Sequence, residues 1–254
     1  MFQGILISAK TNLPAPPTAL LDGASLFLDL DGTLLDLIDR PEEVVADDAL
    51  RALLLALTER LDGRVAVVSG RSLAQLDAIL GSVCDAIALS GSHGCEHRWR
   101  GVLAQPVRPA SLDRVEEAFR RFAGAHPGVM VEGKSYGVGL HYRLAPTVEA
   151  SALALAEALA EEHGLKLQPG KMMVEVRVPG GDKGVAVRRL MSRPPMAGTR
   201  PLFLGDDVTD EAGFAAARAL GGSGVLVGAR RETAAQYRLA GPAAVRAWLA
   251  EALA

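Results

Sequence analysis

The stretch Leu26–Leu35, LFLDLDGTLL, places Asp29 and Asp31 directly after an apolar run. In a β-strand, alternate side chains share a face, so these two aspartates are predicted to point the same way. Two like charges held close in apolar surroundings need a metal ion or another partner. A surface turn rich in Asp and Gly is the alternative, but the preceding residues are too apolar for a solvated strand. We therefore predict a buried strand that ends in a pair of carboxylates.

Composition and charge favour a small-molecule partner. The chain has 254 residues, 49% of them hydrophobic, and a net charge of −3, which argues against nucleic acid or an anionic membrane as the main partner. Two cysteines, Cys84 and Cys95, fit a reducing compartment, and MFQGILISAK at the start lacks the basic segment of a signal peptide. No apolar run approaches the roughly 20 residues that span a bilayer. We expect a cytoplasmic protein, and a monomer.

Both ends of the chain alternate helices with continuous apolar runs. Leucines recur at helical spacing over residues 47–61, with Asp47 or Asp48 as a candidate N-cap. Buried strands are predicted at 26–31, 65–70, 87–91, 200–207 and 224–228, and further helices near 73–80, after Asp182 and over 242–253. This alternation is typical of an α/β fold with a Rossmann-like parallel sheet covered on both faces.

The middle of the chain follows another pattern. Helices are predicted at 111–123 and 147–163, and each is followed by two strands, at 129–143 and 165–178. Helix, two strands, helix, two strands indicates an inserted α+β domain with an antiparallel sheet. We expect a core of residues 1–102 and 179–254 and an inserted domain of residues 103–178, which closes over the substrate by hinges near 102 and 179.

Polar residues follow several of the apolar runs. In an open parallel sheet, ligands bind outside the carboxyl ends of the strands, so these residues are predicted to meet. Carboxylates from two strands would converge there, and hard oxygen ligands suit Mg²⁺. The residues are Asp29, Asp31, Ser69, Ser90 to His93, Asp206 and Asp207, with Asp210 one turn further on.

Two groups fit a bound anion. Lys183 follows Gly180, Gly181 and Asp182 at the start of a helix, where a cation and the helix N-terminus can both face a phosphate. Ser69 offers a hydroxyl at a strand end. Either feature alone is common in proteins, but together they favour a phosphate-containing substrate.

Two other patterns do not fit their context. Gly128–Ser135, GVMVEGKS, satisfies the phosphate-loop pattern, but strand-forming residues fill it and no helical period follows. His93, Cys95 and His97 could suggest zinc, but their alternate spacing lacks a fourth ligand. Neither a nucleotide site nor a zinc site is expected.

Taken together, the D-x-D-G-T motif, the strand-end serine, Asp182-Lys183-Gly184 and Gly205-Asp206-Asp207 resemble the four signature motifs of haloacid dehalogenase-like (HAD) phosphatases. The chain is also similar to the trehalose-6-phosphate phosphatase family. This closer resemblance rests on GDDVTDE at 205–211 and on two stretches of the inserted domain, Glu132-x-Lys134 before His141-Tyr142-Arg143 and Glu175-x-Arg177. It covers nearly the whole chain and identifies the inserted domain as a cap.

The resemblance implies a role for each core motif. Asp29 would be the nucleophile that accepts the phosphoryl group, and Asp31 would protonate the leaving oxygen and then activate water. Lys183 and Ser69 would bind the phosphoryl oxygens. The implied Mg²⁺ ligands are Asp29, Asp31, Asp206 and Asp207, with Asp207 or Asp210 assisting.

The resemblance also implies substrate contacts. Glu132, Lys134 and Glu175 would bind sugar hydroxyls from the cap, and Arg71 and His93 are candidates from the core. The implied reaction is Mg²⁺-dependent hydrolysis of trehalose 6-phosphate. A phosphatase of the same fold for another sugar phosphate, of the sucrose-phosphate or mannosylglycerate-phosphate type, is the alternative enzyme. A non-catalytic phosphosugar-binding module is a third possibility, which the intact Asp29 and Asp31 disfavour.

Overall fold

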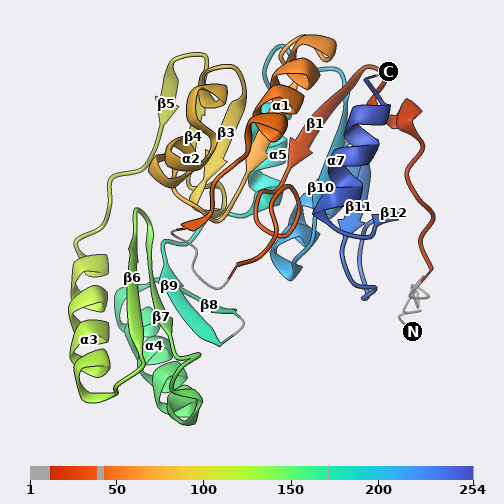
Figure 1. Ribbon diagram of the computed structural model, residues 1–254. Coiled ribbons are helices and arrows are strands. Elements are labelled where there is room, and N and C mark those ends of the chain that lie inside the picture. The colour runs from red at the N-terminus through yellow and green to blue at the C-terminus, as the bar shows by residue number, and fades with distance from the viewer. Residues whose placement is uncertain (1–11, 39–42, 171, 254) are drawn as a thin grey trace, which may run out of the picture. The chain divides into compact units, whose positions relative to one another are not determined.

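The computed structural model describes residues 12–38, 43–170 and 172–253. Contacts divide the chain into two compact units, Met1–Leu103 with Asp182–Ala254, and Ala104–Gly181 (Figure 1). The first ten residues, on which the expected lack of a signal peptide depends, lie outside the described ranges.

The larger unit is built on an eight-stranded sheet with the order β12-β11-β10-β1-β2-β3-β4-β5. Neighbouring strands from β12 to β3 are parallel, whereas β3 and β4 are antiparallel. This confirms the α/β fold class with its parallel sheet, but three short strands were not predicted. Strands β4 and β12 carry charged residues, and β5 has only three residues. The strands are β1 Ala24–Leu28, β2 Val65–Val68, β3 Ala88–Gly91, β4 Glu96–Trp99, β5 Val102–Ala104, β10 Arg200–Gly205, β11 Ser223–Val227 and β12 Tyr237–Leu239.

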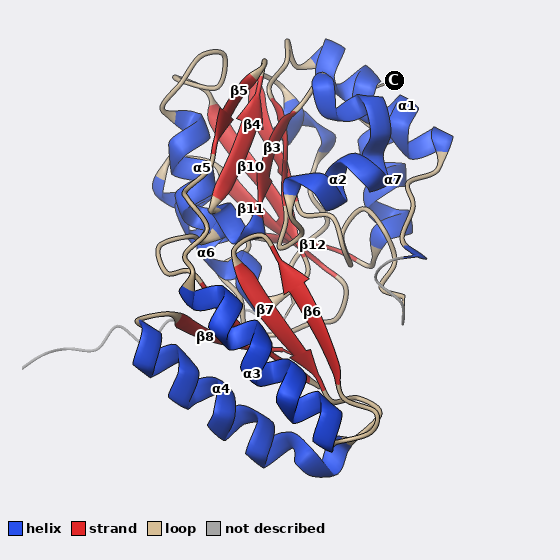
Figure 2. Cartoon of the chain, turned by 90° about the vertical axis from the view of Figure 1, so that its left-hand side faces the viewer, coloured by secondary structure: helices blue, strands red, loops and turns tan. Residues whose placement is uncertain are grey.

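Helices cover both faces of this sheet (Figure 2). Leu26 and Leu28 contribute to the apolar core on one face, and Phe27 contributes to the core on the other, as alternation in a strand requires. Helices α1 Asp48–Arg60, α2 Leu73–Leu80 and α7 Pro242–Glu251 pack on the first face, and α5 Lys183–Met191 and α6 Glu211–Ala219 on the second. The Asp47 side chain caps α1, as predicted. No helix in the described ranges is both long and apolar enough to cross a membrane.

The smaller unit is an antiparallel sheet with two helices. Its strand order is β6-β7-β9-β8, and both helices pack on the face that carries Val138, Leu140, Val174 and Val176. The elements are α3 Ser111–Ala125, β6 Met130–Lys134, β7 Gly137–His141, α4 Glu149–His163, β8 Lys166–Gly170 and β9 Met173–Arg177. The phosphate-loop pattern therefore lies largely in a strand, and a second strand rather than a helix follows it, which confirms that its context fails.

Strand β4 carries a buried histidine that is expected to make stability depend on pH. Burial and the nearby charges of Arg189 and Arg193 lower the pKa of His97 to about 4, from about 6.5 in an unfolded chain. The unfolded state therefore binds a proton that the folded state does not, and stability falls as the pH drops from about 6.5 towards 4. We expect His97 to account for about 2 kcal/mol of the loss between pH 6.5 and 4.5. Urea titrations at both pH values measure it: His97→Leu should flatten the dependence and His126→Gln should not.

Candidate active site

Asp29 lies at the carboxyl end of β1, between β10 and β2 in the sheet. Its N–H donates to the carbonyl of Leu204 over 3.0 Å, and the Thr33 hydroxyl donates to Asp29 Oδ2 over 3.4 Å. Because β1 ends at Leu28, Asp29 and Asp31 both follow the strand rather than lie within it. Strand alternation therefore does not place the two side chains on a shared face. Their carboxylates have different basic partners, Lys183 for Asp29 and Arg71 for Asp31.

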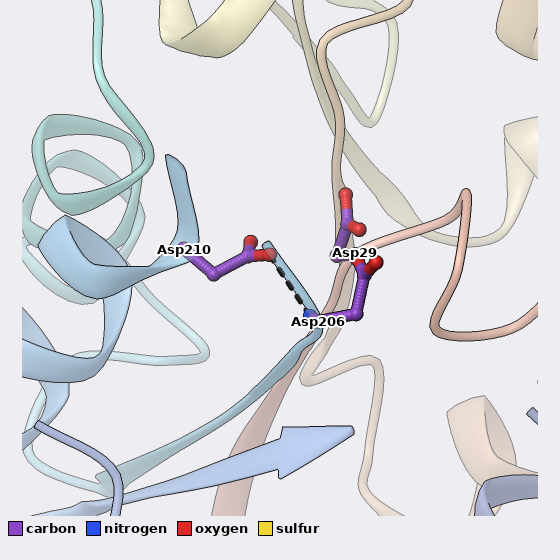
Figure 3. A group of neighbouring side chains, drawn as sticks. All are labelled: Asp29, Asp206 and Asp210. Atoms are coloured by element: carbon purple, nitrogen blue, oxygen red, sulfur yellow. Dashed lines mark hydrogen bonds between the residues drawn. The ribbon is translucent and has the colours of Figure 1, made fainter. Parts of the chain in front are cut away.

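Three carboxylates meet beyond the ends of β1 and β10. Asp29, Asp206 and Asp210, called here the acidic group, each offer an oxygen, and these oxygens all lie within 4.8 Å of one another (Figure 3). Asp210 is fully buried, and its Oδ2 accepts hydrogen bonds from the N–H groups of Asp206 and Asp207 over 3.0 and 2.9 Å. One carboxylate of the group thereby fixes the turn that carries another.

A glycine of the first motif makes room for an aspartate of the last. Gly32 has a φ of +80°, and a Cβ there would lie 2.2 Å from Oδ2 of Asp206. Any larger residue at position 32 would therefore collide with the Asp206 carboxylate and would also be strained by its backbone conformation. The D-x-D-G-T and G-D-D motifs therefore pack against each other here, although Gly32 and Asp206 are 174 residues apart in the sequence.

Lys183 joins the acidic group through two ion pairs. Asp182 caps α5, which begins at Lys183, and the ammonium lies 2.7 Å from Asp29 Oδ1 and 2.6 Å from Asp210 Oδ1. The Lys183 side chain is only 4% exposed. Lys183 is thus a buried cation at the start of α5 and lies at the carboxyl end of the sheet, as the sequence predicted.

The pKa values in this group reflect burial first and an excess of negative charge second. Burial raises the pKa of Asp29 well above its ordinary value despite the opposing charge of Lys183, and burial with the charge of Asp210 raises the pKa of Asp206 to about 6. Burial alone would lower the pKa of Lys183, but the carboxylates of Asp210 and Asp29 outweigh it and raise that pKa. One ammonium does not balance three carboxylates, so the group suits an additional cation.

The remaining core candidates gather around the ends of β2 and β3. The carboxylate of Asp31 accepts two hydrogen bonds from Arg71, from Nε and Nη2, each 2.7 Å long. Ser69 is buried directly after β2 and its Oγ accepts from the Arg71 N–H over 3.1 Å, which leaves the hydroxyl proton able to donate. The ring of His93 lies beside this turn, so close that a Cβ added to Gly70 would come within 2.6 Å of it. The structure thus gives Arg71 an acidic partner inside the protein, which the sequence did not indicate.

The predicted metal ligands are only partly brought together. Within the described residues, the acidic group contains Asp29 and Asp206 but neither Asp31 nor Asp207. Asp207 is exposed and its side chain caps the short turn that begins at Val208, so of the two assisting candidates it is Asp210 that lies in the group. The spacing could have indicated this, since residue 210 lies one turn after residue 206 and can reach back to it.

The predicted cap residues form a cluster on the smaller unit. The Lys134 ammonium lies 2.6 Å from Glu175 Oε2 and 3.7 Å from Glu132 Oε2, while His141 Nε2 lies 2.9 Å from the same Glu132 oxygen. Burial lowers the pKa of Lys134, but the charges of Glu175 and Glu132 outweigh it, and the pKa is raised. His141, from the motif His141-Tyr142-Arg143, is a further member of this cluster that the resemblance does not place among the substrate contacts.

Solved structures of other proteins share the fold of this chain. A haloacid dehalogenase-like hydrolase from Bacteroides thetaiotaomicron aligns with 89% of this chain and 98% of its own, with a TM-score of 0.65 and 16% identity. At that identity the likeness shows the fold alone. The chain therefore has the haloacid dehalogenase-like fold, and its own acidic group lies at the carboxyl ends of strands of the parallel sheet.

Sequence comparisons narrow the class to one family. The trehalose-phosphatase family model matches residues 27–243. Trehalose-6-phosphate phosphatase of Escherichia coli is 37% identical over 226 residues, which are 88% of this chain and 84% of the relative. The C-terminal domain of trehalose-6-phosphate phosphatase from C. albicans covers 96% of this chain and 99% of its own, with 25% identity and a TM-score of 0.80. The chain belongs to the trehalose-phosphatase family, which confirms the resemblance seen in its motifs.

Proposed function

We propose that this protein is a Mg²⁺-dependent phosphatase that hydrolyses trehalose 6-phosphate to trehalose and inorganic phosphate. Family membership supports the reaction. The observation that carries the mechanism is the acidic group with its buried lysine at the ends of adjacent parallel strands.

The acidic group suits Mg²⁺ by its donor atoms and its charge. Carboxylate oxygens are the ligands that this hard ion prefers, and the excess of carboxylates over ammonium groups favours a divalent cation. Asp29 and Asp206 would hold the ion. Both oxygens of Asp210 accept short hydrogen bonds, from Lys183 and from the turn at 206–207, whereas Oδ2 of Asp29 has the long 3.4 Å contact with the Thr33 hydroxyl. When bound, Mg²⁺ would neutralise charge on the phosphoryl oxygens. For Asp31 and Asp207, the role of metal ligand stays a prediction.

In the first half of the reaction, a carboxylate oxygen of Asp29 attacks phosphorus and the bond from phosphorus to the sugar oxygen breaks. The carboxyl of Asp31 gives its proton to that leaving oxygen, and trehalose departs. Lys183 and the hydroxyl of Ser69 bind the phosphoryl oxygens, whose charge is spread in the transition state. An aspartyl phosphate on Asp29 remains.

In the second half, Asp31 takes a proton from a water molecule whose oxygen attacks the same phosphorus. The bond from Asp29 to phosphorus breaks, inorganic phosphate leaves, and both carboxyl groups return to their starting state. Arg71 holds the Asp31 carboxylate by two hydrogen bonds in this structure, so Asp31 must exchange or share that partner when it moves its proton.

Glu132, Lys134 and Glu175 are proposed to bind the hydroxyls of the disaccharide, with Arg71 and His93 contributing from the larger unit. Replacing Lys134 with Ala should lower kcat/KM for trehalose 6-phosphate by about 100-fold, because a charged hydrogen bond contributes roughly 1.5–3 kcal/mol. An aryl phosphate without sugar hydroxyls should lose less than about threefold. Steady-state kinetics on both substrates tests this, with exposed Lys166→Ala as the matched control. Equal losses on the two substrates would contradict the assigned role.

A phosphate-release panel tests the function itself. With Mg²⁺, trehalose 6-phosphate should be hydrolysed with a higher kcat/KM than sucrose 6-phosphate, mannosylglycerate phosphate or glucose 6-phosphate. Preference for another disaccharide phosphate would contradict the substrate assignment. Turnover of none of them would favour a non-catalytic phosphosugar-binding module.

The core and cap roles of the two units, with bounds near residues 103 and 178, are part of the same proposal. So are a monomeric state and a cytoplasmic location. The location is supported by Cys84 and Cys95, which form no disulfide in the described structure.

A further inference from the structure

The turn formed by Asp206 and Asp207 is held from two sides. Its N–H groups donate to Asp210 Oδ2, and its carbonyl groups accept from Arg231, with Nη2 at 2.7 Å from the Asp207 oxygen and 3.5 Å from that of Asp206. Figure 3 shows the first of these contacts, between Asp206 and Asp210. The backbone that carries one member of the acidic group is therefore fixed by side chains on both its donor and its acceptor groups.

Arg231 is itself fixed in place. It lies in the loop after β11, and its Nη1 donates to Glu211 Oε1 and, over 3.1 Å, to the carbonyl of Glu232. The second oxygen of Glu211 accepts from the N–H of Ala234 over 2.7 Å. Glu211 thus connects the start of α6 to this loop, and the Arg231 guanidinium spans from that connection to the turn at 206–207.

We infer that Arg231 is a positioning residue for the metal site, which sets the affinity for Mg²⁺ without contacting the ion. This inference rests on the proposed Mg²⁺ site. Mg²⁺ demands a near-ideal arrangement of its ligands, so a turn that holds Asp206 loosely costs affinity. Partners of metal ligands typically contribute 10- to 100-fold to affinity or activity.

Charge alone would act in the opposite direction. A guanidinium near a cation site repels the ion, so its removal would strengthen binding if repulsion dominated. Glu211 pairs with Arg231 and offsets that charge, and the Arg231 side chain is 24% exposed, so the repulsion is screened. On removal of Arg231, the loss of the fixed position of the turn at 206–207 should therefore change Mg²⁺ affinity more than the loss of charge repulsion.

The test compares Mg²⁺ affinity in four proteins. Arg231→Ala should raise the half-saturating Mg²⁺ concentration by about 10-fold, both in phosphate release and in the thermal shift that Mg²⁺ gives to metal-free protein. Saturating Mg²⁺ should restore kcat to within about twofold of the wild type. The half-saturating Mg²⁺ concentration of Arg231→Lys, which keeps a hydrogen-bond donor, should lie between those of the wild type and Arg231→Ala. That of Arg230→Ala, which replaces an exposed neighbour, should match the wild type.

The possible outcomes separate this inference from the proposed function. An unchanged or lower half-saturating Mg²⁺ concentration in Arg231→Ala, with a reduced melting temperature of the metal-free protein, would mean that Arg231 is merely structural. If Arg231→Ala does not fold, Arg231→Lys decides the question by the same criterion. A wild-type protein without a Mg²⁺-dependent thermal shift or activity would overturn the proposed metal site, and this inference with it.

Discussion

Replacing Asp29 with Asn should lower the turnover of trehalose 6-phosphate by at least about 10⁴-fold, because the amide cannot act as the nucleophile. The fold should survive. Asn has nearly the same shape, the N–H of residue 29 keeps its bond to Leu204, and burial already favours an uncharged group at this position by raising the pKa of Asp29.

Phosphate release under saturating Mg²⁺ measures the loss, and circular dichroism with thermal melting checks the fold. The exposed Asp85→Asn variant is the matched control and should keep wild-type turnover. Residual activity within about 100-fold of the wild type would mean that another residue attacks phosphorus.

Replacing Lys183 with Met should both abolish turnover and destabilise the metal-free protein by about 3–5 kcal/mol. The ammonium forms ion pairs with Asp29 and with Asp210, and its removal leaves these buried carboxylates without that cation. Mg²⁺ should restore part of the stability, since it supplies positive charge to the same group. Urea unfolding with and without Mg²⁺ gives both quantities.

Two further variants identify the cause of that destabilisation. Lys166→Met removes an exposed lysine and should change stability by less than about 0.5 kcal/mol. Adding Asp210→Asn to Lys183→Met removes one of the unpaired charges, so the double variant should be less destabilised than the sum of the two single variants. Additive effects would show that Lys183 and Asp210 do not stabilise each other.

The parts of the site that follow strand ends could be predicted from sequence. An apolar run followed by polar residues indicates both a buried strand and the edge at which it ends, so the sequence alone places Asp29, Ser69 and Asp206 at one edge of the sheet. The position of Lys183 could be predicted for a similar reason, since a glycine-rich turn and Asp182 mark where its helix begins.

Contacts between distant segments could not be predicted in this way. Arg71 meets Asp31 from 40 residues away, and Arg231 meets Asp207 from 24 residues away. No periodicity connects such positions, because only the assembled sheet brings their loops together. Strand β4 was missed because its sequence, EHRW, carries charged residues that a central-strand pattern lacks.

The most direct test is to measure the trehalose and inorganic phosphate that purified wild-type protein forms from trehalose 6-phosphate with Mg²⁺. Asp29→Asn protein at equal concentration is the comparison. We predict equimolar amounts of both products from the wild type, their loss when Mg²⁺ is chelated, and none above background from the variant. Product formation by the two proteins at the same rate, or by neither, would contradict an Asp29-centred phosphatase.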